Sequence, residues 1–453
     1  MPLWKIAWRN MTQRKLSSFL TGLSMALGVA LVVAVLVVYG VVKDSFGNAA
    51  EGYSIIVGAK GGRLQLVLNT VYHLSTPIEN IPWDYYTEFI ATPEKKGRFS
   101  NYVEVAIPYC LGDNYEGFRV VGTTADLFTR LGLGRDPEGN VLQYQFSEGG
   151  VFDPEKPFEA VIGSVAAYRT GLKLGDTFAP THGVSGGPGA HAHDENPFKV
   201  VGILAPTGTP NDRALFVNIE GFFLLEGHAK VIKRPVGESP DAAAHGAHDD
   251  QQDHELLPDE QREVTAILLR TSSPIADLSL PRVINKEQYA QAAMPTREIF
   301  NLFDAIIGPM QMLLLGLAGM VVLVAGIGIM VSIYNSMNDR RRDIAIMRAL
   351  GASRRTISQV VLLESALISI LAGVGGWLLA HGLIAVLNPF LTAQTGVSIG
   401  FFDWATFQVP LGRASFNMPY EVAVLLGLMA VSILIGFLPA ASAHRTDVAK
   451  ALG

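Results

Sequence analysis

The chain has 453 residues, of which 49% are hydrophobic and only 17% are charged, with a net charge of −6. So few charges are unusual for a protein in water, and an acidic chain offers no general basic surface, so nucleic acid is not expected as a partner. The single cysteine, Cys110, excludes an intrachain disulfide framework and a cysteine-rich zinc site. We expect it to be a small buried side chain.

Four apolar segments are long enough to cross a bilayer, which takes about 20 residues. We predict transmembrane helices over residues 17–43, 305–337, 357–388 and 421–443. The first segment is too long for a signal peptide and lacks a cleavage site, so we expect it to remain in the chain. The preceding "MPLWKIAWRNMTQRKL" predicts an amphipathic helix over residues 1–16 in the headgroup layer, the alternative being a plain basic flank.

Residues 44–304 are predicted to form a mixed α/β domain inserted between the first and second spans. Runs rich in β-branched and aromatic residues predict strands at 54–59, 102–109, 117–123, 198–204, 213–219 and 263–270. Residues 157–178 predict a strand, a short helix and a glycine turn before another strand, and residues 284–306 predict a helix that enters the second span. The predicted fold class is therefore membrane α-helical, with one plus three transmembrane helices and a large mixed α/β extracytoplasmic domain.

Charge predicts the orientation of the spans. The stretches 1–15, 336–355 and 444–453 together carry twelve basic and three acidic residues, a local charge of +9, so the rest of the chain carries −15. The positive-inside rule places both termini, the segment 338–356 and the tail 444–453 in the cytoplasm. The domain 44–304 and the loop 389–420 then lie outside.

Two histidine-rich loops, residues 182–197 and 233–261, interrupt the strand pattern and contain six of the ten histidines. Their composition predicts neither helix nor strand. Imidazole and carboxylate suit Zn²⁺. Met and Cys, the ligands of Cu⁺, are absent from His182 to Glu255. Loosely bound Zn²⁺ is one interpretation, and a solvated loop that binds nothing is the other. The candidate ligands are His182, His191, His193, Asp194, His245, His248, Asp249 and His254.

The segment "NSMNDRRRDIAIMRALGASRRTISQVVLLESALI" (335–368) predicts a basic amphipathic helix, a turn and a second helix. Gly351 suits a C-terminal cap and Ser353 an N-cap. Ile344, Met347 and Leu350 form an apolar face that a short loop does not need for itself. This face predicts a protein partner at the membrane surface, and the alternative is that the arginines only fix topology and bind lipid headgroups.

Within that segment, "DIAIMRALGASRRTISQVVLLES" resembles the signature of the ABC transporter permeases of the MacB, LolC/LolE and FtsX group. "GFLPAASAHRTDVAKALG" is similar to the C-termini of that group, and "AVIGSVAAYRTGLKLGDTF" and "FKVVGILAPTGTPNDRALFV" are similar to its outer domain. The resemblance implies a multi-pass protein of the bacterial inner membrane with one span, a periplasmic domain and three more spans. It also implies that ATP-driven closure on the cytoplasmic side moves the outer domains.

No G-x-x-x-x-G-K-[ST] phosphate loop occurs in these 453 residues. We therefore expect a non-catalytic subunit without an intrinsic cofactor, whose partner subunit binds and hydrolyses ATP. The resemblance implies a separate cytoplasmic ABC ATPase and a permease dimer, either a homodimer or a heterodimer with a paralogous permease. The predicted ATPase-coupling residues are Arg341, Arg342, Ile344, Met347, Arg348, Leu350, Gly351, Arg354 and Arg355.

Glu364 is the only acid in the interior of a predicted span, away from its ends, and is therefore a functional candidate, with pairing to an arginine as the structural alternative. His381, near the outer end of the third span, is expected to be a hydrogen-bonded interfacial histidine. The leading hypothesis for the whole chain is a permease in a metal-related, zinc-related envelope transport system, with a periplasmic metal-binding protein or lipoprotein as partner. One alternative is lipoprotein release or export of a small molecule or peptide, with incidental histidines. Another is an FtsX-like signalling scaffold that activates an extracytoplasmic partner.

Overall fold

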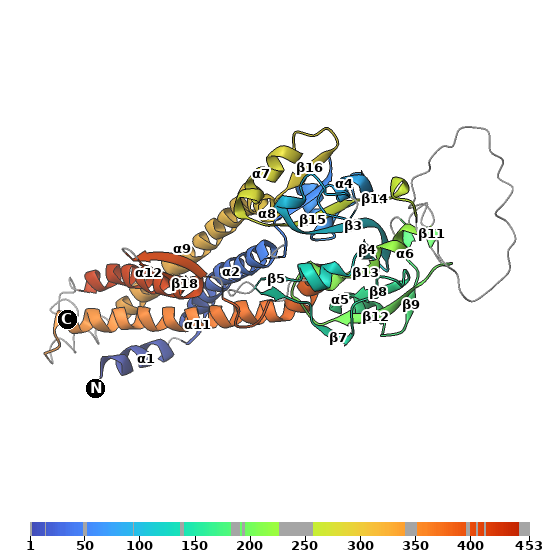
Figure 1. Ribbon diagram of the computed structural model, residues 1–453. Helices are drawn as coiled ribbons and strands as arrows, with labels where there is room; N and C mark the ends of the chain where they lie inside the picture. Colours follow the sequence, from blue (N-terminus) through green and yellow to red (C-terminus); the bar gives the residue numbers. More distant parts are fainter. Residues whose placement is uncertain are drawn as a thin grey trace, which may run out of the picture. The chain divides into compact units, whose positions relative to one another are not determined.

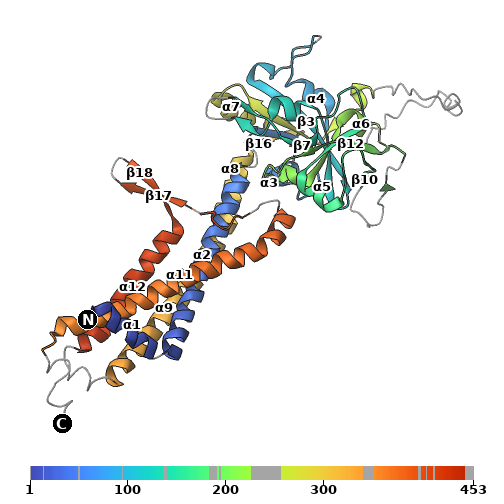
Figure 2. The same cartoon turned by 90° about the horizontal axis from the view of Figure 1, so that it is seen from below.

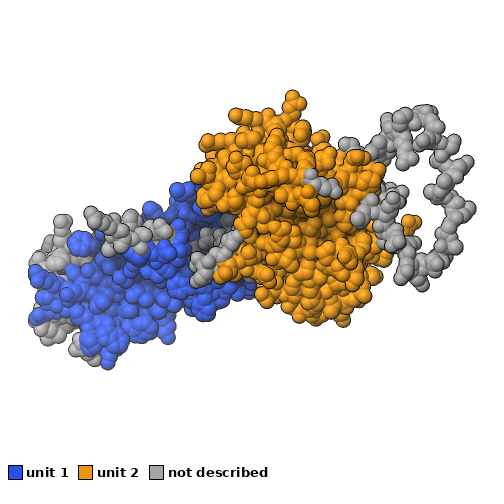
Figure 3. Space-filling model, in the orientation of Figure 1, with its two compact units in different colours: residues 1–44, 303–392, 398–453 blue, residues 45–302, 393–397 orange. Residues whose placement is uncertain are grey.

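The computed structural model describes residues 2–13, 15–48, 52–93, 95–135, 140–182, 191–192, 195–225, 257–339, 351–395, 399–404, 406–411 and 414–443. Contacts divide the chain into two compact units, coloured separately in Figure 3. The helical unit comprises residues 1–44, 303–392 and 398–453, and the sheet unit comprises residues 45–302 and 393–397. The sheet unit is thus inserted in the sequence between the first two long helices.

The helical unit consists mainly of long apolar helices (Figures 1 and 2). Its elements are α1 (Leu3–Gln13), α2 (Lys15–Asn48), the π-helical turn η5 (Phe303–Ile307), α9 (Gly308–Asp339), α11 (Arg354–Thr395), the strands β17 (Thr406–Leu411) and β18 (Ala414–Pro419), and α12 (Tyr420–Ala443). Within the described chain, the helical segments long and apolar enough to cross a membrane are Ser18–Lys43, Pro295–Gly328 and Arg355–Thr392. The apolar helix Tyr420–Leu434 is shorter, so the fourth span stays a prediction.

The helices pack through one regular stripe and several close approaches. Met25, Val29, Val33 and Val37 recur every fourth residue along α2 and are at most 1% exposed, which is the spacing of one helical face. A Cβ atom at Gly376 of α11 would lie 2.6 Å from the Ala26 carbonyl oxygen. Only glycine therefore allows α2 and α11 to approach so closely, as is typical of helix pairs in membranes.

The end of α11 and the segment that leads into α12 differ from the prediction. α11 continues to Thr395 with Pro389 inside it, so the helix extends beyond residue 388, where the predicted third span ends. The following segment contains the antiparallel hairpin of β17 and β18, which leads directly into α12 (Figure 2). The described part of the predicted loop 389–420 therefore includes the end of α11 and the hairpin.

The sheet unit is a mixed α/β fold. Its strands are β1 (Ile55–Ala59), β2 (Ile81–Pro82), β3 (Val103–Tyr115), β4 (Phe118–Thr123), β5 (Gly134–Arg135), β6 (Val141–Leu142), β7 (Phe146–Gly149), β8 (Glu159–Ile162), β9 (Thr177–Phe178), β10 (Thr181–His182), β11 (His191–Ala192), β12 (Phe198–Leu204), β13 (Ala214–Asn218), β14 (Glu263–Val264), β15 (Ala266–Thr271) and β16 (Ala290–Ala293). Its helices are α3 (Arg63–Thr70), α4 (Trp83–Thr87), α5 (Ser164–Thr170), α6 (Ile219–Phe223), α7 (Pro274–Ile284) and α8 (Pro295–Leu302), with the shorter turns η1 (Ser100–Tyr102), η2 (Leu127–Leu131), η3 (Pro210–Arg213) and η4 (Asp259–Gln261).

One large sheet organises the unit, in the order β16-β1-β15-β3-β4-β13-β8-β12-β7. Most neighbours are antiparallel, but β4 runs parallel to β13 and β8 runs parallel to β12. The long strand β3 pairs with β15 along its first half and with β10 at Asp113 and Asn114. The strand β9 pairs with β12, so the strands on the two sides of the first histidine-rich loop are neighbours in the sheet.

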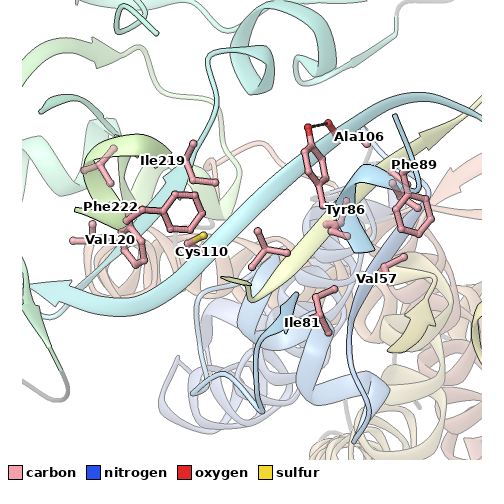
Figure 4. Packing of buried hydrophobic residues seen from close by; sticks show 14 of the residues in the cluster. Val57, Ile81, Tyr86, Phe89, Ala106, Cys110, Val120, Ile219 and Phe222 are labelled. Carbon is pink, nitrogen blue, oxygen red and sulfur yellow. Dashed lines mark hydrogen bonds between the residues drawn. The ribbon is translucent and has the colours of Figure 1, made fainter. Parts of the chain in front are cut away.

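The core of the sheet unit joins the sheet to its covering helices (Figure 4). Phe222 of α6 lies so close to β4 that a Cβ atom at Gly122 would be 2.7 Å from its ring. In the same cluster, nearer the start of β3, the Tyr86 hydroxyl donates to the Ala106 carbonyl oxygen at 3.5 Å. Cys110 is 3% exposed between these regions, which confirms the prediction of a buried side chain, and burial raises the pKa of its thiol well above the usual range.

The predicted strands correspond to β1, β3, β4, β12, β13 and the β14–β15 pair, and residues 157–178 form β8, α5 and β9 as expected. The predicted helix over residues 284–306 is wrong in its first half. α7 ends at Ile284, and Ala290–Ala293 form the edge strand β16, which pairs with β1. The sheet edge supplies hydrogen bonds that override the helix propensity of alanine and glutamine.

Candidate functional site

The start of α11 lies within the predicted ATPase-coupling segment. The Ser353 hydroxyl accepts a hydrogen bond from the Thr356 backbone N–H at 3.2 Å, which confirms Ser353 as the N-cap. Gly351 has a φ of 96°, a conformation that favours glycine, and Arg355 is exposed. The remaining predicted residues of this surface, Arg341, Arg342, Ile344, Met347, Arg348 and Leu350, lie outside the described residues, as does the side chain of Arg354.

Glu364 lies ten residues further along α11 and is 8% exposed. Its neighbour Ser365 is fully buried and donates to the Val361 carbonyl oxygen at 3.2 Å. A Cβ atom at Gly436 of α12 would lie 2.5 Å from the Ser365 hydroxyl oxygen. The acid predicted from the sequence is thus next to a tight α11–α12 contact, where a change in helix packing would alter its surroundings.

A second buried acid in the helical unit is not evident from the sequence. Glu421, in the first turn of α12, is 3% exposed, and its Oε1 lies 3.7 Å from Nε2 of the fully buried His381 of α11. The His381 ring packs against Trp377 and Phe401, with centroid distances of 4.6 Å and 5.5 Å. Neither ring nitrogen has a hydrogen-bond partner in the described part of the chain, so the expectation of a hydrogen-bonded histidine is wrong there. Buried ionisable groups among apolar helices are functional candidates.

An apolar hollow of about 950 Å³ lies between α1, the first turns of α2 and the middle of α11. Trp8, Leu16 and Phe19 line one side and Leu371 and Leu378 the other, with Lys15 at its edge. A hollow of this chemistry takes an apolar ligand or the side chains of a neighbouring helix.

Two histidines of the first histidine-rich loop belong to short strands of the sheet unit. His182 and His191 lie in the short strands β10 and β11, so the prediction that this loop contains no strand is wrong for these residues. Pairing to β3 explains the difference, because residues 179–182 return beside the end of that strand. His193, Asp194, His245, His248, Asp249 and His254 lie outside the described residues.

His182 makes a specific contact with a residue that sequence reasoning missed. Its Nδ1 lies 2.9 Å from Oδ1 of Asp113, whose side chain is 0% exposed, while the His182 side chain is 57% exposed. Asp113 lies 69 positions earlier in the sequence, so no local pattern joins the two. Among the described residues, no group of three or more His, Cys, Asp or Glu side chains stands together as a metal site.

A third polar cluster in the sheet unit surrounds His73, whose φ of 57° is unusual for a residue other than glycine. Both ring nitrogens are buried without a hydrogen-bond partner among the described residues. Burial, followed by the positive charges of Arg119 and Arg213, lowers the pKa of His73 to about 4. Asn211 lies beside the ring and partly opposes this fall in pKa, and its amide also donates to the Tyr144 hydroxyl at 2.6 Å.

Two family models match the chain. Residues 18–249 match the MacB-like periplasmic core domain, and residues 315–448 match the FtsX-like permease C-terminal domain. The first match extends from α2 through most of the sheet unit, and the second covers α9 to α12. The MacB-like match therefore covers most of the sheet unit together with α2, and the FtsX-like match lies almost entirely within the helical unit.

Three relatives illustrate the similarity. The pyoverdine export ATP-binding/permease protein PvdT of Pseudomonas aeruginosa is 24% identical over 99% of this chain and 58% of its own length. The macrolide export ATP-binding/permease protein MacB of Mannheimia succiniciproducens is 27% identical over 35% of this chain and 22% of its own. An uncharacterized ABC transporter permease of Methanocaldococcus jannaschii is 23% identical over 68% of this chain and 65% of its own. The chain thus spans between about a fifth and two thirds of these relatives.

Proposed function

Since the chain belongs to the MacB-like and FtsX-like family of ABC transporter permeases, we propose that it is the membrane subunit through which a separate ATPase moves an extracytoplasmic domain. The helical unit is the membrane part, and the sheet unit is the domain that moves. Both termini and the segment 338–356 face the cytoplasm, because the basic residues gather there.

The absence of a phosphate loop supports a partner ATPase. The names of the pyoverdine and macrolide relatives combine ATP-binding and permease functions, whereas these 453 residues contain no G-x-x-x-x-G-K-[ST] sequence. The chain also spans only 58% of the pyoverdine relative. ATP binding and hydrolysis therefore belong to polypeptide outside these residues, and we assign them to a cytoplasmic ABC ATPase chain.

The observation that carries the proposal is the capped start of α11. Ser353 fixes the first turn of a helix that begins at Arg354 and includes the buried Glu364 and the buried His381. Because α11 is one continuous helix of 42 residues, a displacement at its cytoplasmic start is transmitted along its whole length. A partner held at Arg354, Arg355 and the preceding arginines would thereby shift the bundle as a rigid element.

For the substrate class, the names of the relatives are stronger support than the histidine-rich loops. The curated names of two relatives specify export of pyoverdine and of macrolides, so we propose that the sheet unit handles an organic molecule on the outer side of the membrane. Transport in a zinc-related system is the second candidate, and the contact between His182 and Asp113 favours it. In either case we place the permease in a dimer, as the resemblance to the family implies.

The test is charge reversal at the start of α11. The tagged full chain is purified in mild detergent from its native host, and co-purifying proteins are searched for a phosphate-loop ATPase by mass spectrometry. We expect Arg354→Glu/Arg355→Glu to remove that ATPase from the complex, while Arg354→Lys/Arg355→Lys retains it. Lys5→Glu/Arg9→Glu, an equal double charge reversal at exposed positions of α1, should also retain it. An ATPase that co-purifies equally with the glutamate variant would refute this docking surface.

A further inference from the structure

The apolar hollow between α1, α2 and α11 has one polar end. Among the described residues, α11 contributes only apolar side chains to its lining, between Ile368 and Leu379. The polar side chains of the lining are Thr12, Lys15 and Ser18, which come from the last turn of α1 and the first turn of α2. The hollow therefore combines a positive charge at one end with a hydrocarbon surface along the rest of its length.

The length of the hollow suits one acyl chain. Its lining extends from Lys15 to Ala26 on α2 and from Ile368 to Leu379 on α11, eleven residues further along each helix. At about 1.5 Å per residue this is about 16 Å, close to the roughly 15 Å that one leaflet contributes to the hydrocarbon core of a bilayer. The two helices meet at the far end, where a Cβ atom at Gly376 would lie 2.6 Å from the Ala26 carbonyl oxygen.

The positive end of the hollow lacks a neutralising acid. Lys15 is exposed and forms no ion pair within the described part of the chain. No Asp or Glu occurs in the first 43 residues, so neither α1 nor the apolar length of α2 supplies a carboxylate. Lys5 and Arg9, both exposed on α1, add to the positive charge beside it. Basic side chains next to a membrane helix attract lipids with an anionic headgroup.

We propose that this hollow binds one anionic phospholipid, with an acyl chain between α2 and α11 and the phosphate group at Lys15. Trp8 lines the hollow from α1, which suits the boundary between chain and headgroup, where tryptophan is enriched in membrane proteins. The inference goes beyond the proposed function, since it assigns a ligand to the helical unit. It does not require the ATPase, and its failure would leave the coupling proposal untouched.

Two other occupants of the hollow make different demands. Bilayer lipids in general would fill it without regard to their headgroup, and Lys15 would not matter. An apolar helix of a second copy of the chain would exclude lipid from it. The proposed site instead requires an anionic headgroup, Lys15 and an open hollow, so substitution separates the three explanations.

The experiment measures quenching of Trp8 by brominated lipids in nanodiscs that contain the full chain. Trp4, Trp377 and Trp404 are changed to Phe, and Trp83 gives a constant signal because it packs against the core of the sheet unit. Phosphatidylglycerol or phosphatidylcholine, each with brominated chains, replaces a rising fraction of unbrominated phosphatidylcholine. The quantity of interest is the mole fraction of each brominated lipid that gives half of the maximal quenching.

Substitutions at the two ends of the hollow have matched controls. Lys15→Gln removes the charge and Lys15→Arg keeps it, whereas Lys5→Gln removes a charge from α1 outside the lining of the hollow. Gly22→Leu fills the hollow from α2, at a position where a Cβ atom meets nothing within 4 Å. Gly382→Leu makes the same change at an equally open position of α11 outside the lining. Thermal melting of each variant shows whether it is folded.

We expect half-maximal quenching at an about 10-fold lower mole fraction of phosphatidylglycerol than of phosphatidylcholine, the effect of one hydrogen bond between charged groups. Lys15→Gln should abolish this preference, and Lys15→Arg and Lys5→Gln should keep it. Gly22→Leu should raise the mole fraction of phosphatidylglycerol that is needed, and Gly382→Leu should not. Equal mole fractions for the two lipids in the Lys15 protein, or an unchanged preference in Lys15→Gln, would overturn the site.

Discussion

The buried His73 makes the stability of the sheet unit depend on pH. Its ring nitrogens are enclosed without a hydrogen-bond partner among the described residues, and burial and the charges of Arg119 and Arg213 lower its pKa to about 4. In the unfolded chain the same group titrates near its ordinary value of 6.5. Between these two values the unfolded state binds more protons than the folded state, so the free energy of unfolding falls as the pH falls.

The size of the effect follows from the two pKa values. A fall from 6.5 to about 4 costs about 2 kcal/mol of stability between pH 7 and pH 5, and about 3 kcal/mol by pH 4. The perturbation is His73→Asn, because asparagine tolerates the left-handed conformation at φ 57° and has no group that titrates in this range. The variant should therefore lose less stability than the unsubstituted chain as the pH falls.

The assay is chemical unfolding of the full chain in detergent, with Trp4, Trp8, Trp377 and Trp404 changed to Phe. The fluorescence of Trp83, which packs against the core of the sheet unit, then reports unfolding of that unit. Other carboxylates and histidines titrate as well, so the quantity of interest is the difference between the two proteins at each pH. We expect that difference to change by about 2 kcal/mol between pH 7 and pH 5 in favour of the asparagine variant. Parallel pH profiles for the two proteins would show that His73 is not held neutral by its surroundings.

Two further substitutions test how each unit is held together. Gly376→Leu should destabilise the helical unit by about 3 kcal/mol, because the leucine side chain would meet the α2 backbone. Thermal melting measures this loss. The control Gly382→Leu, at a glycine with nothing within 4 Å, should melt at the same temperature as the unsubstituted chain. Arg270→Met should destabilise the sheet unit by about 3 kcal/mol or more, since the guanidinium donates to the backbone carbonyl oxygens of residues 52, 130 and 131. Denaturant unfolding measures that loss, and an equal loss in the exposed Arg282→Met would contradict the hydrogen-bond explanation.

The apolar helices and the central strands could be predicted because their local patterns agree with their surroundings. The runs that became β1, β12 and β13 are rich in Ile, Val and Phe, and the structure buries all or most of each strand. Burial in the sheet stabilises the same side-chain types that favour an extended backbone locally. The N-cap Ser353 was predictable for a similar reason, since its hydroxyl bonds to a residue only three positions away.

The failures occur where a distant part of the chain decides the local structure. Ala290–Ala293 has the composition of a helix, yet it completes the sheet beside β1, which lies more than 200 residues earlier. The same is true of the candidate sites. Asp113 meets His182 only through the register of β3 and β10, and Glu421 meets His381 only through the packing of α12 against α11. No spacing within the sequence carries that information.

The most direct test of the central claim is whether nucleotide binding moves the sheet unit. A Cys110→Ala chain carries spin labels at Tyr168→Cys in the sheet unit and Phe402→Cys in the helical unit, both at exposed positions. Pulsed electron resonance measures the distance between them in nanodiscs with the co-purified ATPase, without nucleotide and with ATP trapped by a hydrolysis-deficient ATPase. A second pair within the sheet unit, Tyr168→Cys with Ile275→Cys, is the control for rigidity.

We predict that ATP changes the distance distribution of the first pair and leaves that of the second unchanged. The change should disappear when Arg354→Glu/Arg355→Glu is added, because the ATPase is then uncoupled from α11. Identical distributions for the first pair with and without ATP, in a complex that still contains the ATPase, would contradict the claim that this chain converts ATP-driven closure into movement of its outer domain.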